Sequence, residues 1–123
     1  MGKTRGNAEE PVIAQDRGQV GHRGDNAVAA YVIVFREGPI TDIESLATYH
    51  RKARQVKGDF KITPLAFDGR VVGLEGKEPE GVVVLEFPTI EDAKAWYNDP
   101  DYQEALGYRL KAAEHRGFIV EGL

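Results

Sequence analysis

The stretch from residue 82 to residue 109, VVVLEFPTIEDAKAWYNDPDYQEALGYR, decides the fold of this chain. Its first six residues, 82–87, are apolar apart from Glu86, which is typical of a buried strand. Thr89, followed by an acid three residues later, predicts the start of a helix. Asp99-Pro100 breaks this helix and starts another, because aspartate caps a helix and proline fits its first position. The stretch therefore predicts a buried strand followed by a broken helix.

The residues before this stretch predict three further elements. Residues 28–36 are β-branched and aromatic on both faces, which indicates a central strand. Residues 41–44, TDIE, match a capping box with the threonine as the cap, so a helix is predicted from there to about Val56. Residues 62–76 predict two short strands around the turn Asp68-Gly69.

The complete order of elements predicts an α+β fold. Gly117 is expected to end the last helix, and residues 118–121 form the last strand. The resulting order is strand, helix, two-strand hairpin, strand, broken helix, strand, which suits a ferredoxin-like sandwich. We expect an antiparallel sheet of four or five strands with helices on one face. Because its central strands are apolar on both faces, we predict a homodimer packed through the sheet face.

Residues 1–27 differ in composition from the rest of the chain. They are rich in glycine and charge, and Val12-Ile13 lies at the centre of their one short apolar patch. Such a segment buries too little apolar surface to offset its ordering entropy. We predict a flexible arm, or an arm that docks on a neighbouring subunit, followed by a single ferredoxin-like domain over residues 28–123.

Composition restricts the classes of function. The net charge of −4 disfavours a nucleic-acid partner, which requires a clustered basic surface. The chain lacks cysteine, its histidines lack metal-ligand spacing, and it has no phosphate-binding glycine loop, so we expect neither a metal nor a cofactor. No apolar run reaches the roughly 18 residues of a membrane helix, and no signal peptide is evident. We therefore expect a cytoplasmic protein without a membrane partner.

Several segments resemble the bacterial family called domain of unknown function 1330, over residues 29–123. The segments that carry the resemblance are AYVIVFREG, FDGRVVGLEG, GVVVLEFPTIEDAKAWYNDPDYQEAL and the terminal FIVEG. The resemblance implies a dimeric α+β barrel, similar in fold to small cofactor-independent monooxygenases, muconolactone isomerases and stress-responsive barrel proteins. It implies no established activity, and a function taken from those relatives is an analogy from fold alone.

Two polar side chains lie near the centres of otherwise apolar helix faces. His50 lies in the first helix and Arg109 in the last, and both point at the sheet if the helices share one face. A cation in an apolar layer needs an anionic partner, because isolating it costs several kcal/mol. Glu86 is a candidate for that partner, but the sequence does not fix which face of its strand it occupies.

Two interpretations of these residues stay open. In the first, Arg109 forms a structural ion pair or snorkels, and His50 is a hydrogen-bonded, half-buried histidine. In the second, Arg109 is a clamp for a carboxylate or carbonyl oxygen and His50 is a general base or proton relay, so both are candidate catalytic residues. The candidate ligand-binding residues around them are Tyr49, Glu86, Trp96 and Tyr102.

Two functions follow from these interpretations. The first is a small-molecule-binding or cofactor-independent enzyme-like domain that acts on an aromatic or carbonyl-bearing metabolite. The second is a non-enzymatic, stress-associated or structural dimeric interaction module whose polar core residues only stabilise the fold. A cavity between His50, Trp96 and Arg109 would favour the first function, and a solid, ion-paired core the second.

Overall fold

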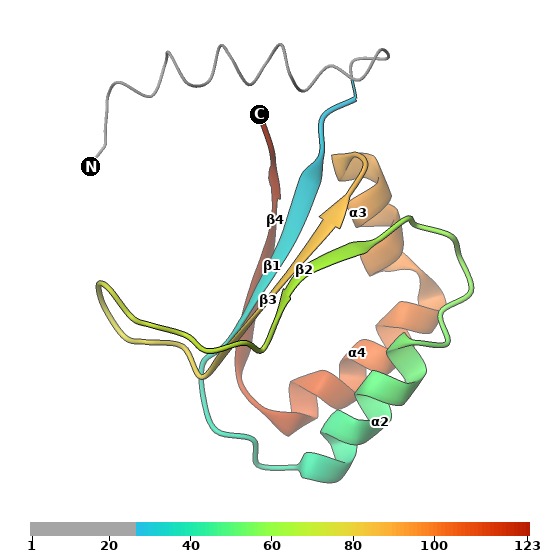
Figure 1. Ribbon diagram of the computed structural model, residues 1–123. Coiled ribbons are helices and arrows are strands. Elements are labelled where there is room, and N and C mark those ends of the chain that lie inside the picture. Colours follow the sequence, from blue (N-terminus) through green and yellow to red (C-terminus); the bar gives the residue numbers. More distant parts are fainter. Residues whose placement is uncertain (1–26) are drawn as a thin grey trace.

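The computed structural model describes residues 27–123, so all of the predicted N-terminal arm except Ala27 lies outside the described residues. The elements run in the order shown in Figure 1. They are β1 (Ala30–Arg36), α2 (Ile43–Ala53), β2 (Thr63–Phe67), β3 (Gly81–Phe87), α3 (Ile90–Asn98), α4 (Pro100–Ala112) and β4 (His115–Glu121).

The four strands form one antiparallel sheet in the order β2-β3-β1-β4. Strand β1 lies at its centre with β3 on one side and β4 on the other, as the apolar composition of residues 28–36 predicted. Helix α2 leads from β1 to β2, and β3 then fills the place between them; α3 and α4 lead from β3 to β4 on the other side of β1. This is the ferredoxin-like topology. The predicted fold class is therefore confirmed.

All three helices cover the same face of the sheet, and the opposite face is open (Figure 1). The core lies between these layers, and its largest fully buried side chains are those of Phe87 and Tyr102. The rings of Trp96 and Tyr102 lie 4.1 Å apart between centroids, so the broken helix packs its aromatic residues against each other and against β3. Burying such a side chain stabilises the fold by about 1.5–3 kcal/mol.

The caps of the broken helix are those predicted, whereas the cap of α2 is not. Thr89 accepts a hydrogen bond from the backbone N–H of Asp92, and Asp99 caps α4. For α2 the cap is Asp42, whose carboxylate accepts hydrogen bonds from Ser45. Thr41 is one residue too early, because its N–H and hydroxyl both donate to the carbonyl of Ala112 at the end of α4.

Of the hairpin predicted around Asp68-Gly69, only the first strand is present. Thr63–Phe67 forms β2, but it pairs with β3 rather than with residues after the turn. Residues 68–80 form a long loop instead, and the sheet has four strands. Asp68 begins the loop with a positive φ of 57°, and its N–H donates to the carbonyl of Val82 at 2.8 Å. The turn signal was correct, but the strand that it joins lies 13 residues further along.

Gly117 does not end the last helix, as had been expected. Helix α4 ends at Ala112, and Gly117 lies inside β4, opposite Val34 of β1. A Cβ atom at Gly117 would lie 3.4 Å from Cγ2 of Val34, so glycine at this position leaves room for the Val34 side chain. The helix ends early because His115 already pairs with Arg36 in the sheet.

Candidate functional site

Two adjoining hollows lie between the helices and the sheet. The deeper one has a volume of about 100 Å³ and the larger, more open one about 450 Å³. The side chains common to both are those of Val34, Trp96, Tyr102, Arg109 and His115. The deeper hollow is also lined by Tyr49 and His50, so five of the six predicted site residues border one cavity.

Arg109 is the one charged side chain of the described residues that is buried, with 8% of its surface exposed. Helix α4 carries it on the same face as the buried Tyr102 and Leu106. Its guanidinium carbon lies 5.5 Å from the centre of the Tyr49 ring. Within residues 27–123, its Nε has no hydrogen-bond partner and no carboxylate lies within ion-pair distance. A buried guanidinium therefore faces the cavity with unused donor capacity.

Glu86, the sixth predicted residue, is not brought to Arg109. In the antiparallel register Val34 pairs with Val83, and Val34 lines the cavity. Glu86 pairs with Tyr31. Each lies three residues from the cavity-lining position of its own strand, Val83 or Val34, so both side chains point to the open face. There the Tyr31 hydroxyl donates to Oε2 of Glu86 at 3.4 Å. The sheet thus separates Glu86 from Arg109.

The two tyrosines form the polar part of the cavity's aromatic wall. The hydroxyl oxygens of Tyr49 and Tyr102 lie 2.9 Å apart, so one donates to the other. Burial raises the pKa of Tyr102 far above its ordinary value, with a smaller contribution from Tyr49, while the charge of Arg109 opposes the shift. Tyr102 therefore stays protonated at every physiological pH and provides a neutral hydroxyl.

His50 borders the same cavity from α2. Its ring lies 5.3 Å from the ring of Tyr49 and 5.8 Å from the ring of Phe67, measured between centroids. Burial lowers the pKa of His50, Asp68 raises it and Arg54 lowers it further, with a net decrease below 6.5. At neutral pH the imidazole is therefore uncharged and able to accept a proton, which is the state a general base requires.

His115 is a further cavity residue that the predicted site did not include. Its Nδ1 lies 2.9 Å from the carbonyl oxygen of Ala113. A carbonyl only accepts, so Nδ1 donates and Nε2 is the free acceptor of the neutral ring. Burial, followed by the charge of Arg109, lowers the pKa of His115. Strand β4 begins at His115, three residues earlier than predicted, and alternation within it puts His115, Gly117 and Ile119 on the cavity side. This alternation is the signal that could have identified His115 as a cavity residue.

Arg36 and Asp68 also border the deeper hollow and were absent from the predicted site. Gly81 lies against them, since a Cβ atom there would lie 2.6 Å from Oδ1 of Asp68 and 3.0 Å from Nη2 of Arg36. The cavity thus has one polar end, formed by these two residues with the histidines, and one aromatic wall. Sequence reasoning missed this end because Asp68 was assigned only to a turn.

The described residues provide no conventional metal site or membrane helix. No group of three or more His, Asp or Glu side chains within residues 27–123 is arranged to hold a metal ion. In the same part of the chain, no helix has the length and apolar composition to cross a bilayer.

Comparisons with known proteins identify relatives of this arrangement. Residues 29–123 match the model of the family described as Domain of unknown function (DUF1330). No curated protein matched the chain. A solved structure of RPA0582, a protein of unknown function from Rhodopseudomonas palustris, is similar with a TM-score of 0.54 and 20% identity, covering 94% of this chain and 95% of that chain. The structure of methylated RPA0582 has a TM-score of 0.55 and 20% identity, covering 94% and 93%.

A third solved structure has a lower similarity. It is a dimeric protein of unknown function and ferredoxin-like fold from Bacteroides fragilis, with a TM-score of 0.45 and 12% identity, covering 76% of this chain and 95% of that chain. The two structures of the Rhodopseudomonas palustris protein support the fold described above.

Proposed function

The chain belongs to the DUF1330 family, and from its own residues we propose that it binds a small organic anion in the cavity beneath the helices. The observation that carries the proposal is the buried guanidinium of Arg109, whose Nε has no hydrogen-bond partner and which has no carboxylate within ion-pair distance among the described residues. Arginine binds a carboxylate through two parallel hydrogen bonds, and a water-poor environment strengthens both of them. A bound carboxylate or oxyanion would also give the buried cation a counter-charge at ion-pair distance, which no carboxylate of the described residues provides.

The walls of the cavity favour an aromatic or carbonyl-bearing metabolite. Trp96, Tyr102 and Tyr49 present ring surfaces, while Val34 and Leu85 of the sheet are apolar. The larger hollow, of about 450 Å³, lies within the usual range for sites that take small organic ligands. One cation among aromatic rings suits a planar acid better than a sugar, which would need many more hydrogen-bond partners.

In this proposal His50 moves a proton to or from the bound molecule. Its neutral imidazole borders the deeper hollow together with Arg109, which would hold the substrate's oxygen. A carbonyl oxygen held by a guanidinium makes the neighbouring C–H or O–H more acidic, and a neutral histidine can then accept that proton. The ring of His115, with Nε2 free, is a second acceptor at the same cavity.

A purely structural role for Arg109 has less support. An ion pair needs a carboxylate, and Glu86, the candidate for it, lies on the open face with Tyr31. A snorkelling arginine keeps its head group in water, whereas only 8% of the Arg109 surface is exposed. The stacking on Tyr49 offsets part of the desolvation of the cation but leaves Nε without a partner.

Ligand-induced thermal stabilisation tests the proposal. Benzoate and salicylate at millimolar concentration should raise the melting temperature of the wild-type protein, whereas benzamide, which is neutral, should not. Arg109→Gln should abolish this shift. The matched control is Arg51→Gln, which removes the same charge from an exposed position of α2 and should keep the shift. Equal shifts in all three proteins, or no shift for any aromatic or aliphatic acid, would overturn the proposal.

The proposed partner of the chain is a second copy, packed through the open face of the sheet. By alternation from the cavity-lining positions, that face carries Tyr31, Ile33, Phe35, Val82, Val84, Phe118 and Val120, together with the charged Glu86 and Arg116. Of these, Phe118 and Val120 each leave 44% of their surface exposed. A largely apolar face of this kind usually marks an interface, and a twofold axis would pair it with itself.

A further inference from the structure

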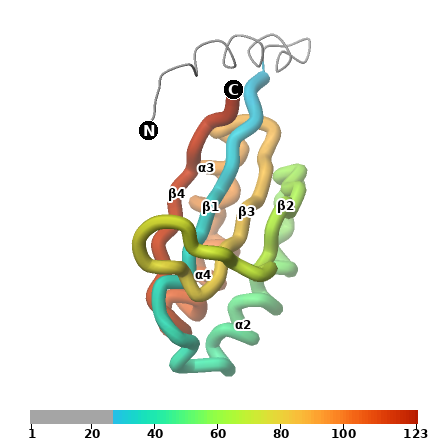
Figure 2. Tube along the Cα trace, turned by 60° about the vertical axis from the view of Figure 1, so that its left-hand side comes forward, coloured from blue at the N-terminus to red at the C-terminus, as the bar shows by residue number. Residues whose placement is uncertain are grey.

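The loop of residues 68–80, between β2 and β3, leaves the sheet on the side opposite the helices. Figure 1 shows it projecting away from α2 and α4 beyond the sheet. After the rotation of Figure 2 the same loop crosses in front of β1 and β4, so it stands over one end of the open face. We call it the arm loop. It does not fold back onto the core of its own chain.

Both ends of the arm loop are fixed to the sheet. At its start the N–H of Asp68 donates to the carbonyl of Val82 at 2.8 Å, and at its end the N–H of Glu80 donates to the carbonyl of Arg36 at 2.7 Å. Within the loop, the carboxylate of Glu78 accepts a hydrogen bond from the N–H of Gly73 at 2.6 Å. The loop therefore has a defined shape and direction.

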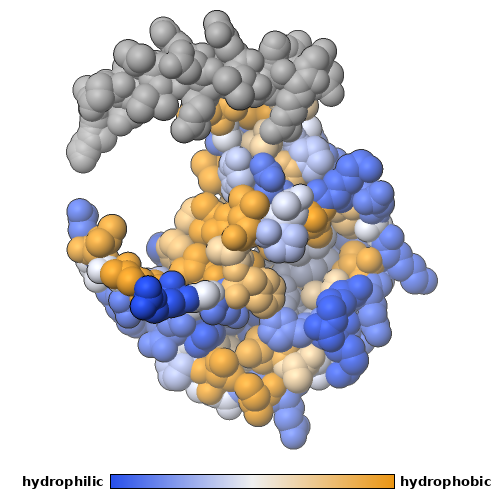
Figure 3. All heavy atoms as spheres, in the orientation of Figure 1, coloured by the Kyte–Doolittle hydropathy of each residue, from blue (hydrophilic) through white to orange (hydrophobic). Residues whose placement is uncertain are grey.

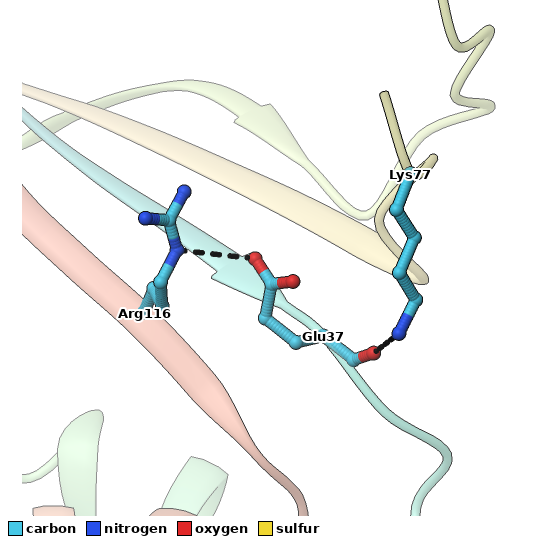
Figure 4. A network of polar contacts seen from close by, with 3 residues as sticks. All are labelled: Glu37, Lys77 and Arg116. Carbon is cyan, nitrogen blue, oxygen red and sulfur yellow. Dashed lines mark hydrogen bonds and ion pairs between the residues drawn. The ribbon is translucent and has the colours of Figure 1, made fainter. Parts of the chain in front are cut away.

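A polar network adds a further attachment on the side of β4 (Figure 4). The ammonium group of Lys77 donates to the carbonyl oxygen of Glu37 at 3.0 Å. The carboxylate of Glu37 in turn accepts a hydrogen bond from Nε of Arg116 at 3.3 Å. Glu37 thus links the arm loop to β4, and the loop is held in its projecting position rather than lying along its own sheet.

The arm loop presents apolar side chains that its own chain does not cover. Leu74 has 91% of its surface exposed and Val72 has 69%. In Figure 3 the loop stands out from the body of the molecule, with hydrophobic residues beside charged ones. Burial of either side chain would contribute stabilisation in proportion to its apolar area, and nothing within residues 27–123 provides that burial.

We propose that the arm loop clasps a second copy of this chain across the open sheet face. The inference rests on the proposed sheet-to-sheet dimer and adds a specific contact to it. A second copy on the open face would occupy the space into which the loop projects, so Val72 and Leu74 would be buried against it. The twofold axis of such a dimer makes the contact reciprocal, with two arm loops holding one interface.

Sedimentation equilibrium of a double variant, Val72→Ser/Leu74→Ser, tests the clasp. Both residues are exposed in the single chain, so the variant should keep the wild-type circular dichroism spectrum. We expect its dimer dissociation constant to rise at least tenfold. The control is Ile43→Ser, at a position of α2 with 66% exposure, close to that of Val72, but on the helical side of the sheet. This control should leave the dissociation constant unchanged.

A second measurement follows the loop directly. Because the chain has no cysteine, Leu74→Cys can carry a single environment-sensitive fluorophore, whose emission should shift to the blue as the protein concentration passes through the dissociation constant. A dimer that Phe118→Lys disrupts, but that shows neither the tenfold weakening nor the blue shift, would overturn the clasp and leave the sheet interface standing. A monomeric wild-type protein at micromolar concentration would overturn both.

Discussion

The guanidinium of Arg109 lies 5.5 Å from the ring centre of Tyr49, and this contact joins α4 to α2 directly above the cavity. No carboxylate of the described residues lies within ion-pair distance of Arg109, and its Nε has no hydrogen-bond partner there. A desolvated cation–π contact contributes about 2 kcal/mol, whereas burying an isolated charge costs several kcal/mol. In the proposed function, a bound anion would supply the counter-charge that the cation–π contact replaces only in part.

Replacing Arg109 with methionine should make the unliganded protein more stable. The change removes a buried, unpaired charge and keeps an unbranched side chain that fills the same space. We expect the free energy of unfolding in urea at pH 7 to rise by about 1–4 kcal/mol, the range seen when buried ion pairs are replaced by apolar residues of similar volume. The control Arg51→Met, at an exposed position, should change it by less than about 0.5 kcal/mol. A loss of stability in Arg109→Met would assign Arg109 a structural role instead.

The hydroxyl pair of Tyr49 and Tyr102 should contribute a modest, measurable coupling. Tyr102→Phe removes one hydroxyl from a fully buried ring and should lower the free energy of unfolding by about 0.5–1.5 kcal/mol. Tyr49→Phe should cost at least as much, because it takes the Tyr49 partner away from the hydroxyl of the fully buried Tyr102. A double-mutant cycle measures the pair directly, and a coupling of zero would mean that the 2.9 Å contact adds nothing to stability.

Much of this site was predictable because it depends on helix periodicity. The spacing of Tyr102, Leu106 and Arg109 places them on one helical face, and Tyr49 and His50 point from α2 to the same layer. The prediction of the helix cap failed where another element binds the expected cap residue. Thr41 matches a capping box, yet its N–H and hydroxyl donate to the carbonyl of Ala112, and Asp42 caps α2 instead.

The strand positions were harder to predict, because a run that is apolar on both faces carries no parity signal. Glu86 was a reasonable partner for Arg109 until the register with Tyr31 placed it on the open face. The last strand was expected to begin at Phe118 but begins at His115, since no local feature marks where β4 begins. Both outcomes depend on strand pairing between distant segments, and a single sequence does not encode that pairing locally.

The stability of the protein should fall on mild acidification through the two cavity histidines. Burial lowers the pKa of both His50 and His115 below their ordinary value of 6.5 in the folded chain. Just below pH 6.5 the unfolded chain therefore binds more protons than the folded chain, and the free energy of unfolding decreases as the pH falls through that window. Above about pH 7.5 both states hold neutral imidazoles, and this contribution no longer varies.

Urea denaturation between pH 7.5 and pH 5 measures this effect. In the double variant His50→Gln/His115→Gln, the decrease in the free energy of unfolding between these values should be smaller than in the wild-type protein. The control His50→Gln alone should remove part of it, since His115 still titrates. An unchanged pH dependence in the double variant would mean that neither imidazole resists protonation in the folded state.

A lysine in the open face should separate the proposed dimer. Phe118 lies on β4 opposite Ile33, and its ring packs edge-on against Phe35 at 5.8 Å between centroids. In a dimer formed through this face, Phe118→Lys would place two unpaired ammonium groups in an apolar interface, one from each copy. We expect the dissociation constant from sedimentation equilibrium to rise at least 100-fold, or about 3 kcal/mol. Ile43→Lys, on the helical side, should leave it unchanged, and an undisturbed Phe118→Lys dimer would place the interface elsewhere.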